Sequence, residues 1–290
     1  MFPSTARSRA LLTFALLAVL AMQPGQAQEA MPSVPALPSG REVLRRAEEV
    51  RSPEMDYAVE FVLEATDPTS SWKERTASYM MIAHGKDYSL VMMREPSQFY
   101  PGTLLIAKGF YWLLLPRSDR AFQLAPRHVL NGDISNGDLA RGNLLAFYEP
   151  RLQGEALIRG EPCWHLELTR TTNMAMYKKI HAWITKKDYR PWRFHYYGET
   201  GSLLKVADYE DYRQTALGIR SMRIRVQNKM RPGEETVLTF SRLRKIDASV
   251  LDYTREALLA FRDAALAHQK LDGEQAQAED LLRLLGKSGS

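Results

Sequence analysis

A succession of short segments in which apolar and polar residues alternate constrains this fold more than any other feature of the sequence. In one such segment Val59, Phe61 and Leu63 point one way, while Glu60 and Glu64 point the other. A two-residue period is typical of a β-strand, because successive side chains lie on opposite faces of the sheet. The pattern recurs along most of the chain, so strands are expected to dominate the structure.

The expected strands fall into two groups, separated by an interrupted segment at residues 126–150. The first group covers about 59–64, 79–82, 88–93, 103–107, 110–115 and 121–125, and the second covers about 151–159, 163–171, 178–186, 191–198, 203–211, 219–229 and 235–246. Turn residues such as Gly85-Lys86-Asp87 and Pro232-Gly233 lie between the strands. Sequential hairpins without a βαβ unit predict a mainly β fold, an antiparallel curved sheet or barrel, and argue against a Rossmann or TIM fold.

Helices are expected on both sides of the strands. Ser39 is a predicted N-cap for a helix that runs to about Arg51, where Pro53 closes it. A second helical region begins at about Thr254. We expect one domain at residues 39–271, preceded by a flexible, proline-containing leader at 28–38 and followed by a weakly ordered tail at 272–290.

The N-terminal residues 1–27 have the pattern of a secretory signal peptide. Arg7 and Arg9 precede an apolar run from Ala10 to Met22, and small residues stand before a cleavage point near Ala27. The run is shorter than the roughly 20 residues of a membrane-spanning helix. The mature protein is therefore expected in the periplasm, and its net charge falls from +5 to +3 once Arg7 and Arg9 are removed.

The sequence contains no recognisable catalytic motif, and neither a metal nor another cofactor is expected. His165, His181 and His195 lie on strands that could be neighbours, but their spacing is not that of metal ligands. We interpret them as ordinary histidines on a polar sheet face rather than as an enzymatic site. The single cysteine, Cys163, lies in an apolar stretch and is interpreted as a structural thiol.

The most basic stretch of the mature chain surrounds Arg220, Arg223 and Arg225. Export and a small net charge argue against a nucleic-acid partner. A solvated strand face is the simplest interpretation, and docking to an anionic lipid surface or a protein partner is the alternative.

Five stretches in order resemble the outer-membrane lipoprotein-sorting family, the LolA/LolB-like superfamily. They are Phe110 to Pro116 with the basic residues that follow, Ser135 to Arg141, Gly154 to Leu168, Trp183-Ile184 with Tyr189-Arg190-Pro191, and Tyr196 to Arg213. The resemblance implies an unclosed antiparallel β-barrel wrapped over short helices. It also implies a cavity that holds acyl chains during transit across the periplasm, without catalytic residues.

A carrier of this kind needs an apolar lining and a means of release. Strand alternation suggests a lining of Phe61, Leu63, Met80, Met92, Leu105, Trp112 and Leu114, although a register error of one residue would invert each face. The interrupted segment is interpreted as a lid whose glycines hinge and whose contacts are Val129, Leu130, Leu139, Leu144, Leu145 and Phe147. Methionines in or beside the strands suit a surface that accepts varied shapes, but a plain barrel core is the simpler explanation for them.

Two functions follow from the resemblance. The first is a monomeric carrier of lipid or lipoprotein acyl chains, loaded by an inner-membrane transporter and directed to an outer-membrane acceptor. The second is a sensor of the same fold that reports lipid or lipoprotein to a partner protein through Arg220, Arg223 and Arg225.

Overall fold

A large antiparallel sheet dominates the computed structural model, which describes residues 37–68, 74–125, 129–131, 134–135 and 144–286. In these residues the sheet has 13 strands in the order β6-β5-β4-β3-β2-β1-β15-β14-β13-β12-β11-β10-β9. The strands are β1 (Tyr57–Thr66), β2 (Glu74–His84), β3 (Tyr88–Glu95), β4 (Thr103–Ala107), β5 (Phe110–Leu114), β6 (Phe122–Leu124), β9 (Tyr148–Ile158), β10 (Glu161–Arg170), β11 (Lys179–Thr185), β12 (Pro191–Tyr197), β13 (Leu203–Thr215), β14 (Gly218–Asn228) and β15 (Glu235–Lys245). The mainly β prediction is confirmed, and the expected strands are present.

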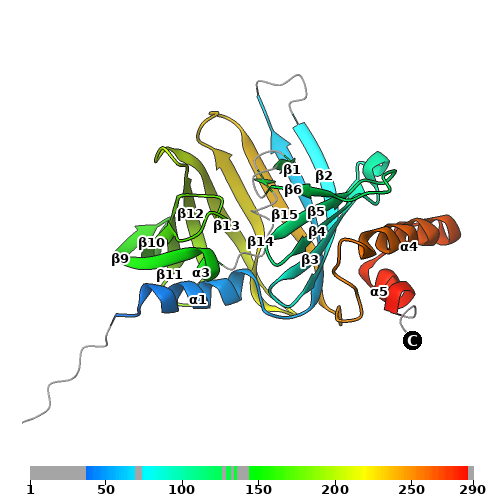
Figure 1. The fold of residues 1–290 in the computed structure, drawn as a ribbon. Coiled ribbons are helices and arrows are strands. Elements are labelled where there is room, and N and C mark those ends of the chain that lie inside the picture. Colours follow the sequence, from blue (N-terminus) through cyan, green and yellow to red (C-terminus); the bar gives the residue numbers. More distant parts are fainter. Residues whose placement is uncertain (1–36, 69–73, 126–128, 132–133, 136–143, 287–290) are drawn as a thin grey trace, which may run out of the picture. The chain divides into compact units, whose positions relative to one another are not determined.

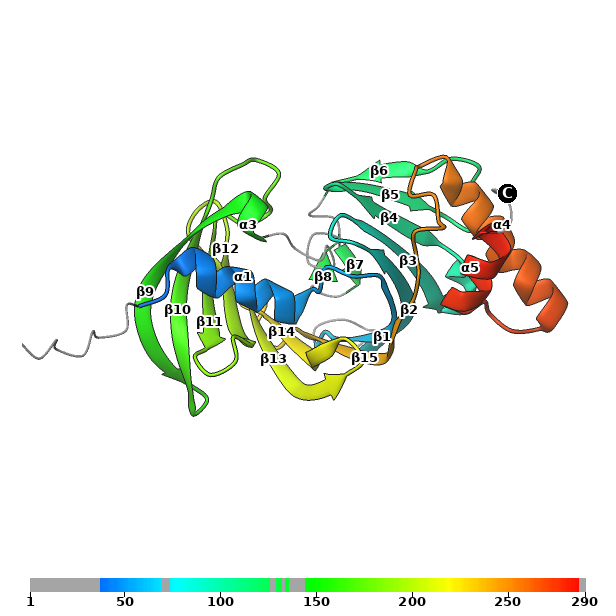
Figure 2. The same ribbon diagram turned by 90° about the horizontal axis from the view of Figure 1, so that it is seen from below.

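The strand order explains why the barrel is unclosed. Strands that follow one another in the chain pair as hairpins, and β1 pairs with β15 to join the first strand to the last. The sheet therefore has its free edges at β6 and β9, on either side of the interrupted segment. Figure 2 shows these two edges facing each other across the open side of the curved sheet. We refer to this open side, between β6 and β9, as the seam.

Part of the interrupted segment lies at the seam. Its described residues form the short pair β7 (Val129–Asn131) and β8 (Ile134–Ser135), and the single helical turn α3 (Leu144–Phe147). Ile134 is 2% exposed and belongs to the core on the concave face of the sheet. The mixture of short elements agrees with the loss of strand periodicity in the sequence.

Helix α1 (Gly40–Arg51) packs into the concave side of the sheet, with Val43, Leu44 and Ala47 buried. The predicted cap is confirmed, since the Ser39 hydroxyl accepts a hydrogen bond of 3.1 Å from the Glu42 backbone N–H. A 3-10 turn, η1 (Ser97–Phe99), lies between β3 and β4. Figure 1 shows α1 beneath the second group of strands.

Helices α4 (Ala257–Asp272) and α5 (Ala278–Gly286) cover the outer face of the first group of strands. Residues 278–286 lie in the stretch that the sequence predicted to be a weakly ordered tail, yet Leu281 is fully buried there. The Tyr100 hydroxyl holds the region to η1, donating to the Ala265 carbonyl and accepting from the Ala276 N–H. Burial of one apolar helix face against the sheet supplies the order that the local sequence does not reveal.

The sheet thus separates two apolar cores within the unit formed by residues 38–290. One core fills the concave face together with α1, and the other lies between the outer face and α4 and α5. Strands β2 to β5 are buried on both faces, whereas β9 to β14 have a more polar outer face.

Candidate functional site

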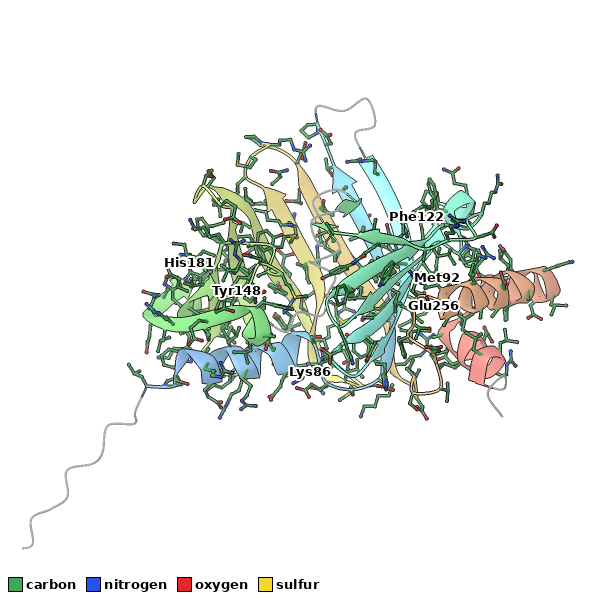
Figure 3. All side chains as sticks on the ribbon, in the orientation of Figure 1. Lys86, Met92, Phe122, Tyr148, His181 and Glu256 are labelled. Carbon is green, nitrogen blue, oxygen red and sulfur yellow. The ribbon has the colours of Figure 1, made fainter. Side chains whose placement is uncertain are left out.

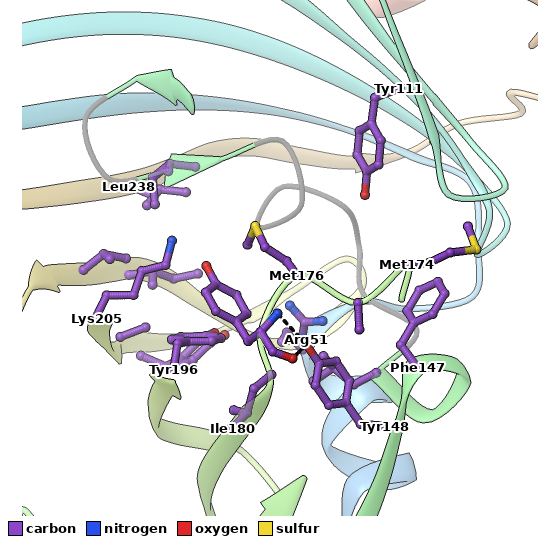
Figure 4. Close-up of a pocket in the computed structure, with 18 residues that line it drawn as sticks. Arg51, Tyr111, Phe147, Tyr148, Met174, Met176, Ile180, Tyr196, Lys205 and Leu238 are labelled. Atoms are coloured by element: carbon purple, nitrogen blue, oxygen red, sulfur yellow. Dashed lines mark hydrogen bonds between the residues drawn. The ribbon is translucent and has the colours of Figure 1, made fainter. Parts of the chain in front are cut away.

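A cavity of about 120 Å³ lies on the concave face, between α3, β9, the connection at 173–177 and strands β11 to β15. Its lining is mainly aromatic and aliphatic, and includes Tyr111, Phe147, Tyr148, Met176, Tyr177, Ile180, Tyr196, Tyr209, Ile224 and Leu238. Figure 4 shows these side chains arranged around the space from both groups of strands. The alternation of β12 and β13 contributes to this lining, because Tyr196 and Tyr209 point inward while His195 and Asp208 point outward.

Three kinds of polar group enter this apolar lining. The Tyr148 hydroxyl is held by the Tyr177 backbone, donating to its carbonyl at 3.1 Å and accepting from its N–H at 3.2 Å. The Lys205 Nζ lies 5.2 Å from the centre of the Tyr177 ring and 5.9 Å from that of Tyr196. Arg51, the last residue of α1, has the Tyr209 phenol as a hydrogen-bond partner.

Further pockets extend the cavity along the concave face. A pocket of about 80 Å³ shares Arg51, Tyr209 and Ile224 with it, and one of about 150 Å³ lies under β2 to β6 beside Tyr79. A cavity of about 150 Å³ holds a ligand the size of benzene. An acyl chain therefore needs several of these pockets, or displacement of side chains that line them.

A more open pocket lies at the seam. It is formed by Phe110, Tyr111, Leu124 and Met174, of which Phe110 is 52% and Met174 is 48% exposed. It shares Tyr111 and Met174 with the cavity, and Leu124 with the pocket beside Tyr79. The described residues thus place the pocket at the seam next to both the cavity and the pocket beside Tyr79.

The structure divides the seven predicted lining residues between the two faces of the sheet. Phe61 and Leu63 belong to the concave core, as expected. The other five lie in the outer core, packed toward α4 and α5: they are Met80, Met92, Leu105, Trp112 and Leu114. Figure 3 shows Met92 on the side of the sheet near Glu256, at the start of α4.

The outward position of these five residues has a physical cause. Phe61 pairs with Tyr79 across β1 and β2, and its ring stacks on that of Tyr79 at 5.1 Å, so Tyr79 rather than Met80 faces inward. Helices cover the outer face of β2 to β5, and both faces of these strands are therefore apolar. A strand that is buried on both faces carries no polar alternation from which its inner face can be read.

The predicted lid residues have different positions. Leu144 and Phe147 line the cavity, and Leu145 packs against the concave core. The backbone of Val129 and Leu130 forms β7, but their side chains lie outside the described part of the structure, as does all of Leu139.

The three predicted docking arginines do not share one face. Arg220 donates a hydrogen bond of 2.8 Å to the Val50 carbonyl at the end of α1, and lines the 80 Å³ pocket. Arg223 and Arg225 lie within 3.5 and 3.3 Å of the Glu210 carboxylate, and Arg225 also pairs with Glu235 at 2.6 Å. These ion pairs reduce the charge that the arginines present to a partner.

The three histidines meet on the outer face, on the neighbouring strands β10, β11 and β12. His165 Nε2 lies 2.7 Å from His181 Nδ1, and the Trp183 ring contacts both His165 and His195. Burial lowers the pKa of all three, that of His195 to about 4. They are therefore neutral at pH 7, and no cluster among the described residues has the composition of a metal site.

None of the described helices has the length and apolar character needed to cross a membrane.

Comparison with known proteins agrees with the fold. The model of a family described as uncharacterized protein matches residues 85–258, more than half of the chain. A LolA superfamily protein from Nitrosomonas europaea has a similar structure, with a TM-score of 0.67 and 27% identity, over 73% of this chain and 95% of that protein. No curated protein matches the sequence.

Two further solved structures share the fold. A DUF1329 family protein from Desulfovibrio piger has a TM-score of 0.64 and 22% identity, over 72% of this chain and 92% of its own. An outer membrane lipoprotein-sorting protein domain from Vibrio parahaemolyticus has a TM-score of 0.64 and 19% identity, over 72% of this chain and 93% of its own.

Proposed function

We propose that this protein is a carrier that shields acyl chains in its concave cavity. The chain belongs to the family whose model matches residues 85–258, and to the LolA-like superfamily. The proposed carrier receives lipid or lipoprotein from an inner-membrane transporter and delivers it toward the outer membrane. The predicted signal peptide at 1–27 and the lipoprotein-sorting neighbour support a periplasmic location. We place this function in the single unit formed by residues 38–290, and the proposal includes no catalytic step.

One observation carries the proposal: apolar pockets lie along the concave face and beside the unclosed seam, where Phe110 and Met174 are about half exposed. Each methylene group removed from water contributes about 0.8 kcal/mol, so a chain of many methylenes favours such a surface strongly. A closed barrel with a filled core offers no entry for a chain. The open seam between β6 and β9 supports both entry and release.

Leu144 and Phe147 supply contacts that a cargo would replace. Both line the cavity from α3, which is part of the interrupted segment at residues 126–150. We propose that this segment acts as the lid, with an affinity for cargo set by the difference between lid and lipid contacts with the same surface.

Filling the cavity tests the proposal. Ala207 is 3% exposed and lines the cavity from β13, so Ala207→Phe places a ring in the space assigned to an acyl chain. Met176→Trp narrows the same space from a partly buried position. We expect the wild-type protein to bind a fluorescent fatty-acid probe, and both variants to bind it at least about tenfold more weakly.

The matched control is Ala260→Phe, on an exposed turn of α4 at the outer side of the molecule. It adds the same ring without entering the cavity, and should leave probe binding unchanged. Native mass spectrometry of the wild-type protein should also detect co-purified lipid. Absence of both lipid and probe binding in the wild-type protein would show that the carrier function is wrong.

A further inference from the structure

The pocket under β2 to β6 has one polar side chain in its described lining. The rest of this lining is aliphatic or aromatic, and none of its described side chains is charged. The polar residue is Tyr79, which is 2% exposed and whose hydroxyl has no hydrogen-bond partner among the described residues. Most buried side-chain polar atoms in folded proteins have a partner. The hydroxyl of Tyr79 is therefore an exception.

Neighbouring strands hold the Tyr79 ring on the concave face. The centre of the ring lies 5.1 Å from that of Phe61 across β1 and β2, and Met93 is the partner of Tyr79 across β2 and β3. A side chain on a strand stands roughly perpendicular to the sheet, so the hydroxyl is the part of Tyr79 that extends furthest into the concave side. It lies there beside a pocket of about 150 Å³.

The apolar lining restricts the chemistry of a ligand group that can pair with this hydroxyl. A carboxylate or phosphate in this pocket loses its hydration without meeting a cation, which is costly. A purely hydrocarbon ligand leaves the hydroxyl unpaired, as it is in the empty pocket. A carbonyl group avoids both costs, because its oxygen accepts a hydrogen bond from the phenolic O–H without bringing a charge.

The surroundings of the pocket also suit the carbonyl of an acyl chain. In an acyl ester or amide this carbonyl lies at the junction between a polar headgroup and an apolar chain. The pocket combines the buried Tyr79 with Phe99 and Leu115, which are 45% and 44% exposed. It also shares Leu124 with the pocket at the seam. A carbonyl at Tyr79 therefore has exposed side chains close by for the headgroup and a further apolar pocket for the chain.

We propose that the Tyr79 hydroxyl donates a hydrogen bond to the carbonyl oxygen of an acyl ester or amide in the cargo. This inference rests on the carrier function and specifies its substrate class as acyl esters and amides rather than free fatty acids or alkyl ethers. The hydroxyl is unpaired in the empty protein and gains its partner when cargo binds. Binding thus removes the cost of the unpaired hydroxyl, in addition to burying the chain.

The test compares two lipids that differ only in this carbonyl. They are palmitoyl lysophosphatidylcholine, an ester, and hexadecyl lysophosphatidylcholine, the ether in which a methylene group replaces the carbonyl. Both lipids are used below their critical micelle concentrations, and their dissociation constants are measured by isothermal titration calorimetry. We expect the wild-type protein to bind the ester about fivefold more tightly than the ether, which corresponds to one net hydrogen bond.

The variant is Tyr79→Phe, which keeps the ring and removes the donor, with Tyr253→Phe as the matched control. Tyr253 packs against the outer core, where its hydroxyl donates to the Ala248 carbonyl at 3.0 Å. We expect Tyr79→Phe to bind the ester about fivefold more weakly than the wild-type protein does, and the ether with unchanged affinity. Tyr253→Phe should keep the preference for the ester. Melting curves of the lipid-free proteins should show a higher Tm for Tyr79→Phe, so its stability and its affinity for the ester change in opposite directions.

The outcomes separate the two proposals. If the wild-type protein binds the ester no more tightly than the ether, the carbonyl site is wrong and the carrier function stands. The same conclusion follows if Tyr79→Phe keeps the preference for the ester, or if it weakens the binding of both lipids equally. If the wild-type protein binds neither lipid nor the fluorescent fatty-acid probe, the carrier function fails, and the carbonyl site fails with it.

Discussion

Replacing Tyr79 by phenylalanine should stabilise the protein. Tyr79 is 2% exposed, and its hydroxyl has no hydrogen-bond partner among the described residues. Burial without such a partner also raises the pKa of this phenol. A buried, unpaired hydroxyl costs about 1–3 kcal/mol relative to water.

The substitution isolates this cost, because it keeps the ring that stacks on Phe61 at 5.1 Å. Loss of a few dispersion contacts of the oxygen offsets part of the gain. We expect a net stabilisation of about 1–2 kcal/mol, which for a domain of this size raises Tm by roughly 3–6 °C. Differential scanning fluorimetry and urea unfolding of the lipid-free protein measure the two quantities.

Tyr148→Phe is the matched control, with the opposite expected sign. Tyr148 is 4% exposed, but its hydroxyl makes hydrogen bonds to both the N–H and the carbonyl of Tyr177. Its removal should lower the free energy of unfolding by about 1–3 kcal/mol. The reasoning is refuted if Tyr79→Phe leaves Tm unchanged or lowers it while Tyr148→Phe behaves as expected.

Three further predictions concern parts of the fold away from the cavity. Arg193→Met should destabilise the protein by about 1–3 kcal/mol in urea unfolding, because Asp208, which is 6% exposed, loses its contacts at 2.6 and 2.8 Å and keeps the Arg159 guanidinium at 3.8 Å; a loss below about 0.5 kcal/mol contradicts this. His195 has a folded pKa of about 4, below its unfolded value, so its stabilising contribution is complete above about pH 6.5 and is lost as the pH falls toward 4. The free energy of unfolding of His195→Gln should therefore decrease by roughly 1–2 kcal/mol less than that of the wild-type protein between pH 7.5 and 4.5. Equal decreases would count against the burial of His195. Gly40→Ala should lower Tm by several degrees, since a Cβ there meets backbone atoms of β9 at 2.9 Å, and an unchanged Tm would mean that α1 shifts freely.

The sequence determined the class of fold because its signals are local. Alternation in β1 and β12 to β14, turn residues between strands and the Ser39 cap each depend on neighbours only a few residues away. The loss of alternation at 126–150 likewise lies at the place where the sheet fails to close. Local patterns of this kind survive in a single sequence, and the structure confirms them.

Tertiary structure decided which residues of β2 to β5 face the concave side of the sheet. Met80 and Tyr79 are both apolar enough to be buried, and only the packing of α4 and α5 on the outer face decides which of them lines the concave side. The same helices account for the order of residues 278–286. Because the covering helices come from the far end of the chain, no local pattern in the strands reports them.

The candidate site was also decided by long-range pairing. Arg51 and Lys205 are 154 positions apart in the sequence, and each is unremarkable in its own segment. They line one cavity because β1 pairs with β15, which brings the start and the end of the strand series together, and because α1 packs across the concave face. The sequence by itself specified a strand-rich chain with an interrupted segment, and the pairing of β1 with β15 together with the packing of α1 decided which residues line its cavity.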